Sequence, residues 1–303
     1  MDSTTRGTVA LLYGGSSNER QISILSGKAV EKSLKKLGYK VINVDVDKNF
    51  VYKITKTKFD FAFVALHGKY GEDGRIQGVL DLMNIPYTHS GVLACSVCMD
   101  KICAKSVFSY LGIEVAPGRA TSKKEILSKK TLHNKKHVIK PVSDGSSFNV
   151  YIFENEHNFT KENYPFDSDV MLEEFIDGKE IQVAVVCGKA IGAVEIIPKQ
   201  SAFYDYKTKY TEGMAKQICP AEIPSTIYKT CLDQSKKVYD FLKCKGASRA
   251  DFIYDTKKNR LVMLEFNTHP GFTNLSLVPE IALKCKGITF DQLVEKIILD
   301  IKR

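Results

Sequence analysis

The sequence predicts an α/β protein with a parallel sheet in its N-terminal part and mainly antiparallel strands farther along. Apolar runs alternate with amphipathic helical segments in the first third of the chain. This βαβ order is typical of a parallel sheet with helices on its faces. From Val138 onward the apolar runs follow one another closely, which favours antiparallel hairpins. A length of 303 residues fits two or three packed subdomains.

The N-terminal part should begin with a strand at 9–13, followed by Gly14 and Gly15. A helix that ends at Gly38 should come next, since six apolar residues recur at helical spacing: Ile22, Leu25, Ala29, Val30, Leu34 and Leu37. Further strands are expected at 41–46, 59–66, 138–141, 149–153, 170–175, 180–187 and 190–197, and further helices at 100–111, 225–242 and 293–301. The polar stretch 201–220 lacks apolar periodicity, and a loop of that length is often a lid.

The composition is that of a globular protein, with 44% hydrophobic and 26% charged residues. The chain lacks both a bilayer-spanning apolar run and the apolar region of a signal peptide, so we expect a cytoplasmic protein without membrane contact. A net charge of +9 is compatible with nucleic-acid binding. The lysines are scattered and carry no interleaved aromatic residues, however, so we expect no nucleic-acid partner.

Eight cysteines occur, three of them close together at Cys95, Cys98 and Cys103. A CxxC pair can bind metal or carry out redox chemistry, but no second pair is present. The neighbouring Val97 and Met99 suggest a buried helix instead. We therefore expect reduced, buried thiols, as is usual in a cytosolic protein.

The most informative segment is a predicted hairpin with strands at 248–255 and 261–267. Symmetry about its centre predicts three opposed pairs: Asp251 with Glu265, Arg249 with Asn267, and Asp255 with Leu261. Strand alternation divides the side chains between two faces. One face is apolar and should contact the core: Phe252, Tyr254, Val262, Leu264 and Phe266. The other face combines polar and apolar side chains: Arg249, Asp251, Glu265, Asn267, Ile253 and Met263.

Two carboxylates that face each other across a sheet repel unless they face water or share a cation. The oxygens of Asp251, Glu265 and Asn267 suit Mg²⁺, which prefers hard oxygen ligands and often completes its shell with nucleotide phosphates. From the hairpin alone, a magnesium site and a solvent-exposed charged face are equally good interpretations.

Other segments could bind a nucleotide, although no GxxxxGK[ST] loop occurs. Lys140 ends an apolar strand, and the hydroxyl and N–H groups of turn 143–147 could hold an anion or simply form a hairpin turn. Acids within 172–180 could hold adenine and ribose, or form an acidic turn between strands. Glu19, where a strand leads into a helix, could bind an ammonium group or complement the helix dipole.

Together these segments resemble the D-alanine–D-alanine ligases of the ATP-grasp fold. The resemblance covers nearly the whole chain, with segments in the family's order: 14–20, 65–68, 71–78, 99–101, 140–141, 144–147, 203–210, 219–221, 248–251, 265–273 and 276–279. It implies an N-terminal parallel α/β domain at 1–98, with two further α+β domains, 99–185 and 186–303, that enclose the nucleotide.

The resemblance implies ATP-dependent ligation of two D-alanines to D-alanyl-D-alanine through an acyl phosphate, for peptidoglycan precursor synthesis. ATP and two Mg²⁺ ions, which Mn²⁺ could replace, would be the cofactors, and the enzyme would be a homodimer. Asp251, Glu265 and Asn267 would bind the metal. No protein nucleophile takes part in this chemistry, so catalysis would rest on positioning and electrostatics.

The resemblance also implies a role for individual residues. The nucleotide would be bound by Lys101 and Lys140 at the phosphates, Lys209 at the transferred phosphate, Glu173 and Glu180 at adenine and ribose, and the Ile176 backbone at the adenine edge. The first D-alanine would be bound by Glu19, assisted by Ser146 and Tyr210, with His67 near its carboxylate. Arg249 and the Gly271 N–H would stabilise developing negative charge. Ser276 and the Leu277 N–H would receive the carboxylate of the second D-alanine.

Three residues depart from the family's usual pattern: Asp144 in place of Glu, Asn149 often in place of Gly, and His269 in place of Ser or Leu. These changes could alter loop closure and kinetics. The alternatives are a D-alanine–D-serine or D-alanine–D-lactate ligase, which the pair Lys209 and Tyr210 disfavours, and a non-catalytic nucleotide-binding module. The presence of every expected metal and phosphate group disfavours that module.

Overall fold

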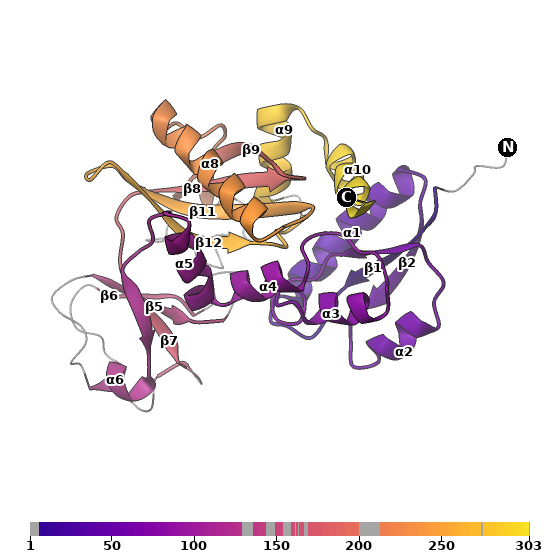
Figure 1. Ribbon diagram of the computed structural model, residues 1–303, viewed down its shortest axis with the longest axis horizontal. Helices are drawn as coiled ribbons and strands as arrows, with labels where there is room; N and C mark the ends of the chain where they lie inside the picture. The colour runs from indigo at the N-terminus through magenta and orange to yellow at the C-terminus, as the bar shows by residue number, and fades with distance from the viewer. Residues whose placement is uncertain are drawn as a thin grey trace.

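The computed structural model describes residues 6–128, 136–143, 149–153, 159–160, 162, 164–166, 169–199, 213–273 and 275–302. Their strands form three sheets, with the orders β2-β1-β3, β4-β7-β5-β6 and β10-β9-β8-β11-β12. In Figure 1 the first sheet lies at one end of the molecule and the other two lie toward the opposite end. The expected combination of a parallel and an antiparallel part is therefore confirmed.

The N-terminal sheet is parallel and consists of β1 (Thr8–Tyr13), β2 (Lys40–Asp45) and β3 (Phe61–Val64). Its helices are α1 (Arg20–Lys36), α2 (Phe50–Thr55), α3 (Arg75–Leu82) and α4 (Val92–Met99). The expectation that Leu25 lies on the buried face of α1 is wrong, since this side chain is 51% exposed. The buried face of α1 combines Ile22, Val30 and Leu34 with small residues, and a Cβ added to Gly27 would lie 2.9 Å from the Cβ of Tyr13.

The central sheet is antiparallel and holds β4 (Gly118–Thr121), β5 (His137–Pro141), β6 (Tyr151–Phe153) and β7 (Val170–Glu174). Helix α5 (Lys101–Tyr110) precedes it, and α6 (Lys123–Leu127) follows β4. The carboxylate of Asp100 caps α5 by accepting the backbone N–H groups of Ile102 and Cys103. This cap sets the point at which Lys101 enters the helix.

The C-terminal sheet is antiparallel, with β8 (Lys179–Val186), β9 (Lys189–Pro198), β10 (Ala215–Ile218), β11 (Ala247–Asp255) and β12 (Arg260–Asn267). Strand β10 lies inside the stretch 201–220 that was expected to be a loop; residues 201–212 lie outside the described part. Strand β7 belongs to the central sheet and β8 to the C-terminal sheet, so the chain passes from one sheet to the next between them. The predicted domain boundary at 185/186 lies later, at the end of β8. The division into domains stays a prediction.

Helices cover both faces of this sheet. On one face α8 (Ser225–Phe241) and α5 pack over Phe252, Met263 and their neighbours. On the other face α9 (Leu277–Lys286) packs against β8 and β9. Helix α10 (Phe290–Leu299) lies beside α1 in Figure 1, with an ion pair between Lys36 and Asp291, and η1 (Asp300–Lys302) ends the described chain. The contact between α1 and α10 connects the N-terminal and C-terminal parts of the fold.

The cysteines are all free thiols in this structure. Burial raises the pKa of Cys95, Cys231 and Cys244 to about 12, so these three thiols stay protonated and unreactive at neutral pH. Cys103 is exposed, contrary to the expectation of uniform burial. No helix in the described ranges combines the length and apolarity required to cross a membrane.

Candidate active site

The hairpin formed by β11 and β12 presents the predicted polar residues in rows across the C-terminal sheet. Asp251 pairs with Glu265, and Arg249 pairs with Asn267, as predicted. On the other side of β11, β8 places Gln182 opposite Asp251. Directly paired residues share a face of the sheet, so one face carries both carboxylates, the guanidinium and the two amides.

A β-bulge divides the hairpin between Asp251 and Phe252. Beyond it Asp255 pairs with Arg260, so the predicted pairing of Asp255 with Leu261 is wrong. A one-residue shift exchanges the two faces of a strand. Met263 therefore packs in the core with Phe252, whereas Val262 contacts Ile253 on the polar face, which reverses the predicted positions of Met263 and Val262.

The two opposed carboxylates share a cation within the protein. Asp251 accepts two hydrogen bonds of 2.7 Å from Nε and Nη2 of Arg249, and Nη2 lies 3.8 Å from Oε1 of Glu265. This arrangement meets the condition under which facing carboxylates are stable. No group of three or more His, Cys, Asp or Glu side chains suited to a metal occurs among the described residues. The candidate set here is two carboxylates and the amide of Asn267, hard oxygen donors that fit Mg²⁺.

A second charged cluster joins α5 to the central sheet. Glu173 on β7 is 3% exposed, and its Oε2 lies 2.6 Å from Nζ of Lys140 on β5. Its Oε1 accepts from Nζ of Lys105, a residue that the sequence analysis missed. Lys101 and Lys105 are four residues apart and therefore on one side of α5, a spacing that could have indicated Lys105. Lys101 is buried as well, and its backbone N–H donates to the carbonyl of Val142.

An apolar patch adjoins this cluster at the predicted adenine edge. Ile176 packs with Ala116, Val262 and Ile253. Glu180, directly opposite Ile253 on β8, accepts a hydrogen bond of 2.9 Å from the amide of Gln182. The predicted adenine and ribose residues thus adjoin the polar rows of the hairpin, and Gln182 is a further residue that the sequence analysis missed.

Glu19 lines an open cleft of about 1010 Å³ between the N-terminal and central sheets. Ser17, Gly68, Val142 and Asn149 contribute to the same cleft. A Cβ at Gly68, where φ is 69°, would lie 3.0 Å from Oε1 of Glu19, so glycine allows this close approach. Asn149 has φ of 55°, a left-handed conformation that Asn accepts in place of Gly. Asp144 and Ser146 lie outside the described residues, as do Lys209 and Tyr210.

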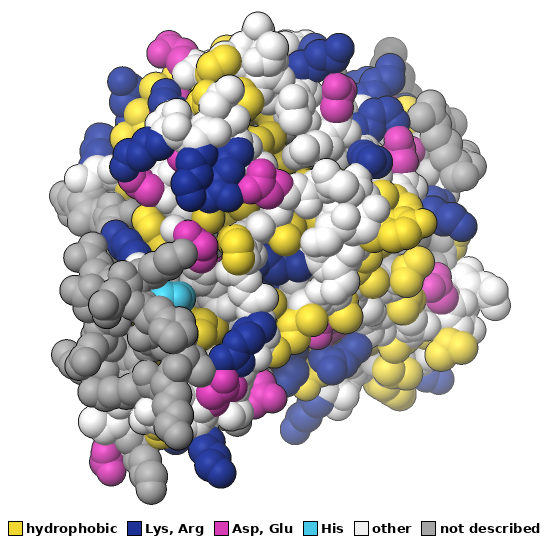
Figure 2. All heavy atoms as spheres, turned by 60° about the vertical axis from the view of Figure 1, so that its left-hand side comes forward, with side chains coloured by type: hydrophobic (Ala, Val, Ile, Leu, Met, Phe, Trp, Pro, Cys, Tyr) yellow, Lys and Arg dark blue, Asp and Glu magenta, His cyan; other side chains and the backbone are white. Residues whose placement is uncertain are grey.

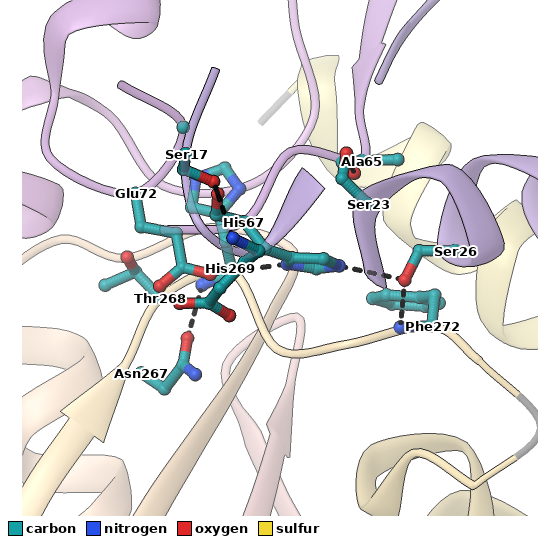
Figure 3. A network of polar contacts seen from close by, with 12 residues as sticks. Ser17, Ser23, Ser26, Ala65, His67, Glu72, Asn267, Thr268, His269 and Phe272 are labelled. Atoms are coloured by element: carbon teal, nitrogen blue, oxygen red, sulfur yellow. Dashed lines mark hydrogen bonds and ion pairs between the residues drawn. The ribbon is translucent and has the colours of Figure 1, made fainter. Parts of the chain in front are cut away.

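His67 is held by a hydrogen-bond network that joins three parts of the chain (Figure 3). The N–H of Phe272 donates to Oγ of Ser26 over 3.1 Å, and this Oγ lies 2.8 Å from Nε2 of His67. On the opposite side of the ring, Nδ1 lies 3.3 Å from Oε1 of Glu72. The network fixes the ring between α1 and the loop after β12. Ser26 and Glu72 were not identified from the sequence.

The buried ring of His269 lies beside this network. Its Nε2 lies 3.1 Å from the amide nitrogen of Gln77, and its ring centroid lies 5.0 Å from that of His89. Burial, with a further contribution from His67, lowers the pKa of His269 to about 3. The amide of Gln77 therefore donates to a neutral ring. The backbone N–H of His269 donates to Oδ1 of Asn267 over 3.0 Å, which joins the histidine to the hairpin.

The loop after β12 leads to the N-terminus of α9. Ser276 precedes the helix, and its Oγ accepts the N–H of Thr273 over 2.8 Å. A Cβ on Gly271 would lie 2.8 Å from this same Oγ. Leu277 is the first residue of α9, and a helix N-terminus favours a carboxylate. The predicted receptor of the second carboxylate thus lies at a helix N-terminus, and its role stays a prediction.

Figure 2 shows one face of the molecule with Lys and Arg side chains interspersed among Asp and Glu. On the described residues of this face, mixed charge is the pattern of an ordinary solvated surface.

Comparisons with known proteins place the chain in a family. The sequence matches the D-ala D-ala ligase C-terminus family over residues 107–299 and the D-ala D-ala ligase N-terminus family over residues 50–90. It is 48% identical to the D-alanine–D-alanine ligase of Wolbachia pipientis wMel, covering 97% of this chain and 94% of that protein. It is 44% identical to the enzyme of Rickettsia felis, covering 98% and 93%.

Solved structures resemble the whole chain. The D-alanine–D-alanine ligase of Bacillus anthracis complexed with ATP gives a TM-score of 0.79 at 29% identity, covering 98% of both chains. The VanG D-Ala:D-Ser ligase of Enterococcus faecalis gives 0.78 at 27% identity, covering 97% of this chain and 99% of that one. Both the sequence matches and the structural matches extend over nearly all of the chain. The chain therefore belongs to the D-alanine–D-alanine ligase family.

Proposed function

We propose that this protein catalyses the ATP-dependent ligation of two D-alanines to D-alanyl-D-alanine. The carboxylate of the first D-alanine attacks the γ-phosphorus of ATP, which gives an acyl phosphate and ADP. The amine of the second D-alanine then attacks the acyl carbon and loses a proton, and inorganic phosphate leaves. The observation that carries this proposal is the paired Asp251 and Glu265 with their shared Arg249, on one face of the hairpin.

The nucleotide would lie between the lysine cluster and the hairpin. Lys101 and Lys140 would bind its phosphates, with Lys209 at the transferred phosphate. The acids Glu173 and Glu180 and the backbone of Ile176 would bind adenine and ribose. The ATP complex of the related Bacillus anthracis enzyme supports ATP as the nucleotide.

Asp251, Glu265 and Asn267 would hold two Mg²⁺ ions, and Mn²⁺ could replace them. Bound Mg²⁺ would neutralise charge on the nucleotide phosphates. When the nucleotide enters, Arg249 would turn from Asp251 toward the reacting carboxyl group. There it would stabilise the developing negative charge together with the N–H of Gly271.

The two D-alanines would bind at opposite sides of the reacting centre. Glu19 would accept the ammonium group of the first, with Ser146 and Tyr210 assisting, and His67 would lie near its carboxylate. Ser276 and the N–H of Leu277, at the start of α9, would receive the carboxylate of the second. Because no side chain forms a covalent bond, the rate would depend on how well these groups align the reactants.

The acceptor is the finer point of the proposal. The structural match to a D-Ala:D-Ser ligase is nearly as good as the match to a D-alanine–D-alanine ligase, so the fold alone does not select the acceptor. The names of the more similar relatives favour D-alanine. In the cell we propose a role in peptidoglycan precursor synthesis, in the cytoplasm and as a homodimer.

An acceptor screen tests the proposal. Purified protein is incubated with ATP, Mg²⁺ and D-alanine, alone or with D-serine, D-lactate or L-alanine, and the products are identified by mass spectrometry. We expect D-alanyl-D-alanine to dominate in every mixture. If a mixed product dominates, the acceptor is D-serine or D-lactate and not D-alanine. Equal use of L-alanine would contradict the proposed specificity for D-alanine.

A further inference from the structure

The buried cluster around Glu173 contains a lysine to which the proposed reaction gives no role. Nζ of Lys105 contacts Oε1 of Glu173 and also donates to the carbonyl of Ala116 over 2.7 Å. Lys140 occupies the other carboxylate oxygen of Glu173. All three charged side chains are buried, so the cluster holds two cations and one anion away from bulk water.

Two of these groups have separate roles in the proposed function. Lys140 would bind the nucleotide phosphates, whereas Glu173 would bind adenine at the other end of the nucleotide. In this structure they bind each other. Nucleotide binding must therefore break this ion pair, and breaking a buried ion pair is strongly unfavourable when one charge is left without a partner.

We propose that Lys105 is a positioning residue that keeps the carboxylate of Glu173 ionised and oriented toward the adenine amino group when Lys140 turns to the phosphates. This inference rests on the proposed function. Lys105 is anchored to the backbone of Ala116, which packs with Ile176 at the predicted adenine edge. It can therefore stay on Glu173 while Lys140 moves.

The charges around Glu173 are consistent with this role. Burial opposes ionisation of Glu173, but Lys140 and Lys105 together hold the pKa of its carboxyl below the usual value. Without both lysines, burial alone would raise that pKa and favour the protonated form. An ionised carboxylate accepts a hydrogen bond from the 6-amino group of adenine. It repels the 6-oxo group of hypoxanthine, which is itself an acceptor.

Base selectivity is therefore the measurement that separates positioning from simple structural support. In Lys105→Met, departure of Lys140 leaves Glu173 without a cation, so its carboxyl takes up a proton and tolerates the 6-oxo base. We expect KM for ATP to rise by at least about tenfold with little change in kcat, as for loss of a hydrogen bond to a charged group. The preference for ATP over ITP should fall by a similar factor. Lys105→Arg, which retains the cation, should preserve most of the preference.

The matched control is Lys237→Met. Lys237 donates to the backbone carbonyl of Leu111 just after α5, without a contact to Glu173 in the described structure. It resembles Lys105 in its lysine–carbonyl contact but is exposed, so its removal reports the loss of such a contact alone. Both nucleotide preference and KM for ATP should stay at the wild-type values in this variant.

Calorimetric binding of ADP and IDP in the absence of D-alanine completes the experiment. This readout needs no ligase activity, so failure of the proposed reaction is distinguishable from failure of the positioning role. If Lys105→Met is poorly folded, Lys105→Gln serves instead, since it also removes the cation and should lose the same ADP preference. Equal weakening of both nucleotides, or an unchanged ADP preference, in whichever variant is folded would overturn the assignment of Lys105.

Discussion

The hairpin and the Glu173 cluster have opposite charge balances. Among the described residues of the hairpin, Asp251 and Glu265 share the cation Arg249. In the Glu173 cluster, two lysines share one carboxylate. These three hairpin side chains together have one excess negative charge, which suits a metal cation, and Glu173 with Lys105 and Lys140 has one excess positive charge, which suits phosphate. A nucleotide–magnesium complex carries both complementary charges.

One carboxylate of the hairpin, Glu265, is accessible, whereas Asp251 is buried like Glu173. The side chain of Glu265 is 32% exposed, whereas that of Glu173 is 3% exposed. An accessible carboxylate can exchange its partner for a cation from solution at low cost. A buried one depends on partners within the protein. The hairpin is thus arranged to receive an ion, and the lysine cluster is arranged to redistribute its own ion pairs.

The largest effect should come from removing the negative excess of the hairpin. Glu265→Ala should lower D-alanine-dependent phosphate release by about a thousandfold. It removes a proposed ligand of the Mg²⁺ ions, whose positive charge would stabilise phosphoryl transfer. Circular dichroism and the melting temperature should remain close to wild type. Glu114→Ala is the control, because Glu114 also pairs with an arginine of this hairpin, Arg260, but away from the polar rows. Normal turnover in Glu265→Ala would contradict the metal assignment.

Removing a cation from the lysine cluster should have a smaller effect that is seen mainly in KM. Lys140→Met should raise KM for ATP by about 10- to 100-fold through loss of a charge-assisted contact to phosphate. Steady-state kinetics at saturating D-alanine, with the exposed Lys124→Met as control, measures this change. A fall in kcat at unchanged KM would place Lys140 at the reacting centre instead of the nucleotide phosphates.

The smallest effect should concern stability and come from the buried, neutral ring of His269, in contrast to the two charged clusters. The pKa of His269 is lowered to about 3 in the folded protein, so the unfolded chain takes up the proton first as the pH falls. Stability should therefore decrease from about pH 6.5 downward, by at most roughly 1.4 kcal/mol per pH unit for one such histidine. His269→Asn should lose less melting temperature between pH 7.5 and 5.5 than wild type. His137→Asn is the control, and equal losses in all three proteins would refute the buried neutral ring.

The hairpin shows how far strand alternation could predict this site. The pairing of Asp251 with Glu265 was correct although the predicted turn was one residue too long. A bulge adds one residue to β12 and restores the register beyond it, so the polar pairs fell in place while Val262 and Met263 exchanged faces. Alternation carries no information on a bulge, because bulges depend on the packing of the complete sheet.

The distant partners of a residue could not be found in this way, even where helical spacing points to the residue itself, as it does for Lys105. Lys105 and Glu173 are 68 positions apart, and Ser26 and Phe272 are 246 apart. Such pairs form only when separate sheets and helices come together, which local periodicity does not encode. Leu25 shows the same limit for packing, since an apolar residue at helical spacing is exposed where small residues allow α1 to approach β1 closely.

Transfer of isotope from substrate to phosphate tests the central claim most directly. D-Alanine labelled with ¹⁸O in its carboxylate is incubated with the enzyme, ATP and Mg²⁺, and dipeptide and inorganic phosphate are analysed by mass spectrometry. An acyl phosphate predicts one ¹⁸O in each phosphate released, with phosphate and dipeptide formed in equal amounts. Dipeptide without label in phosphate, or phosphate release without dipeptide, would contradict it.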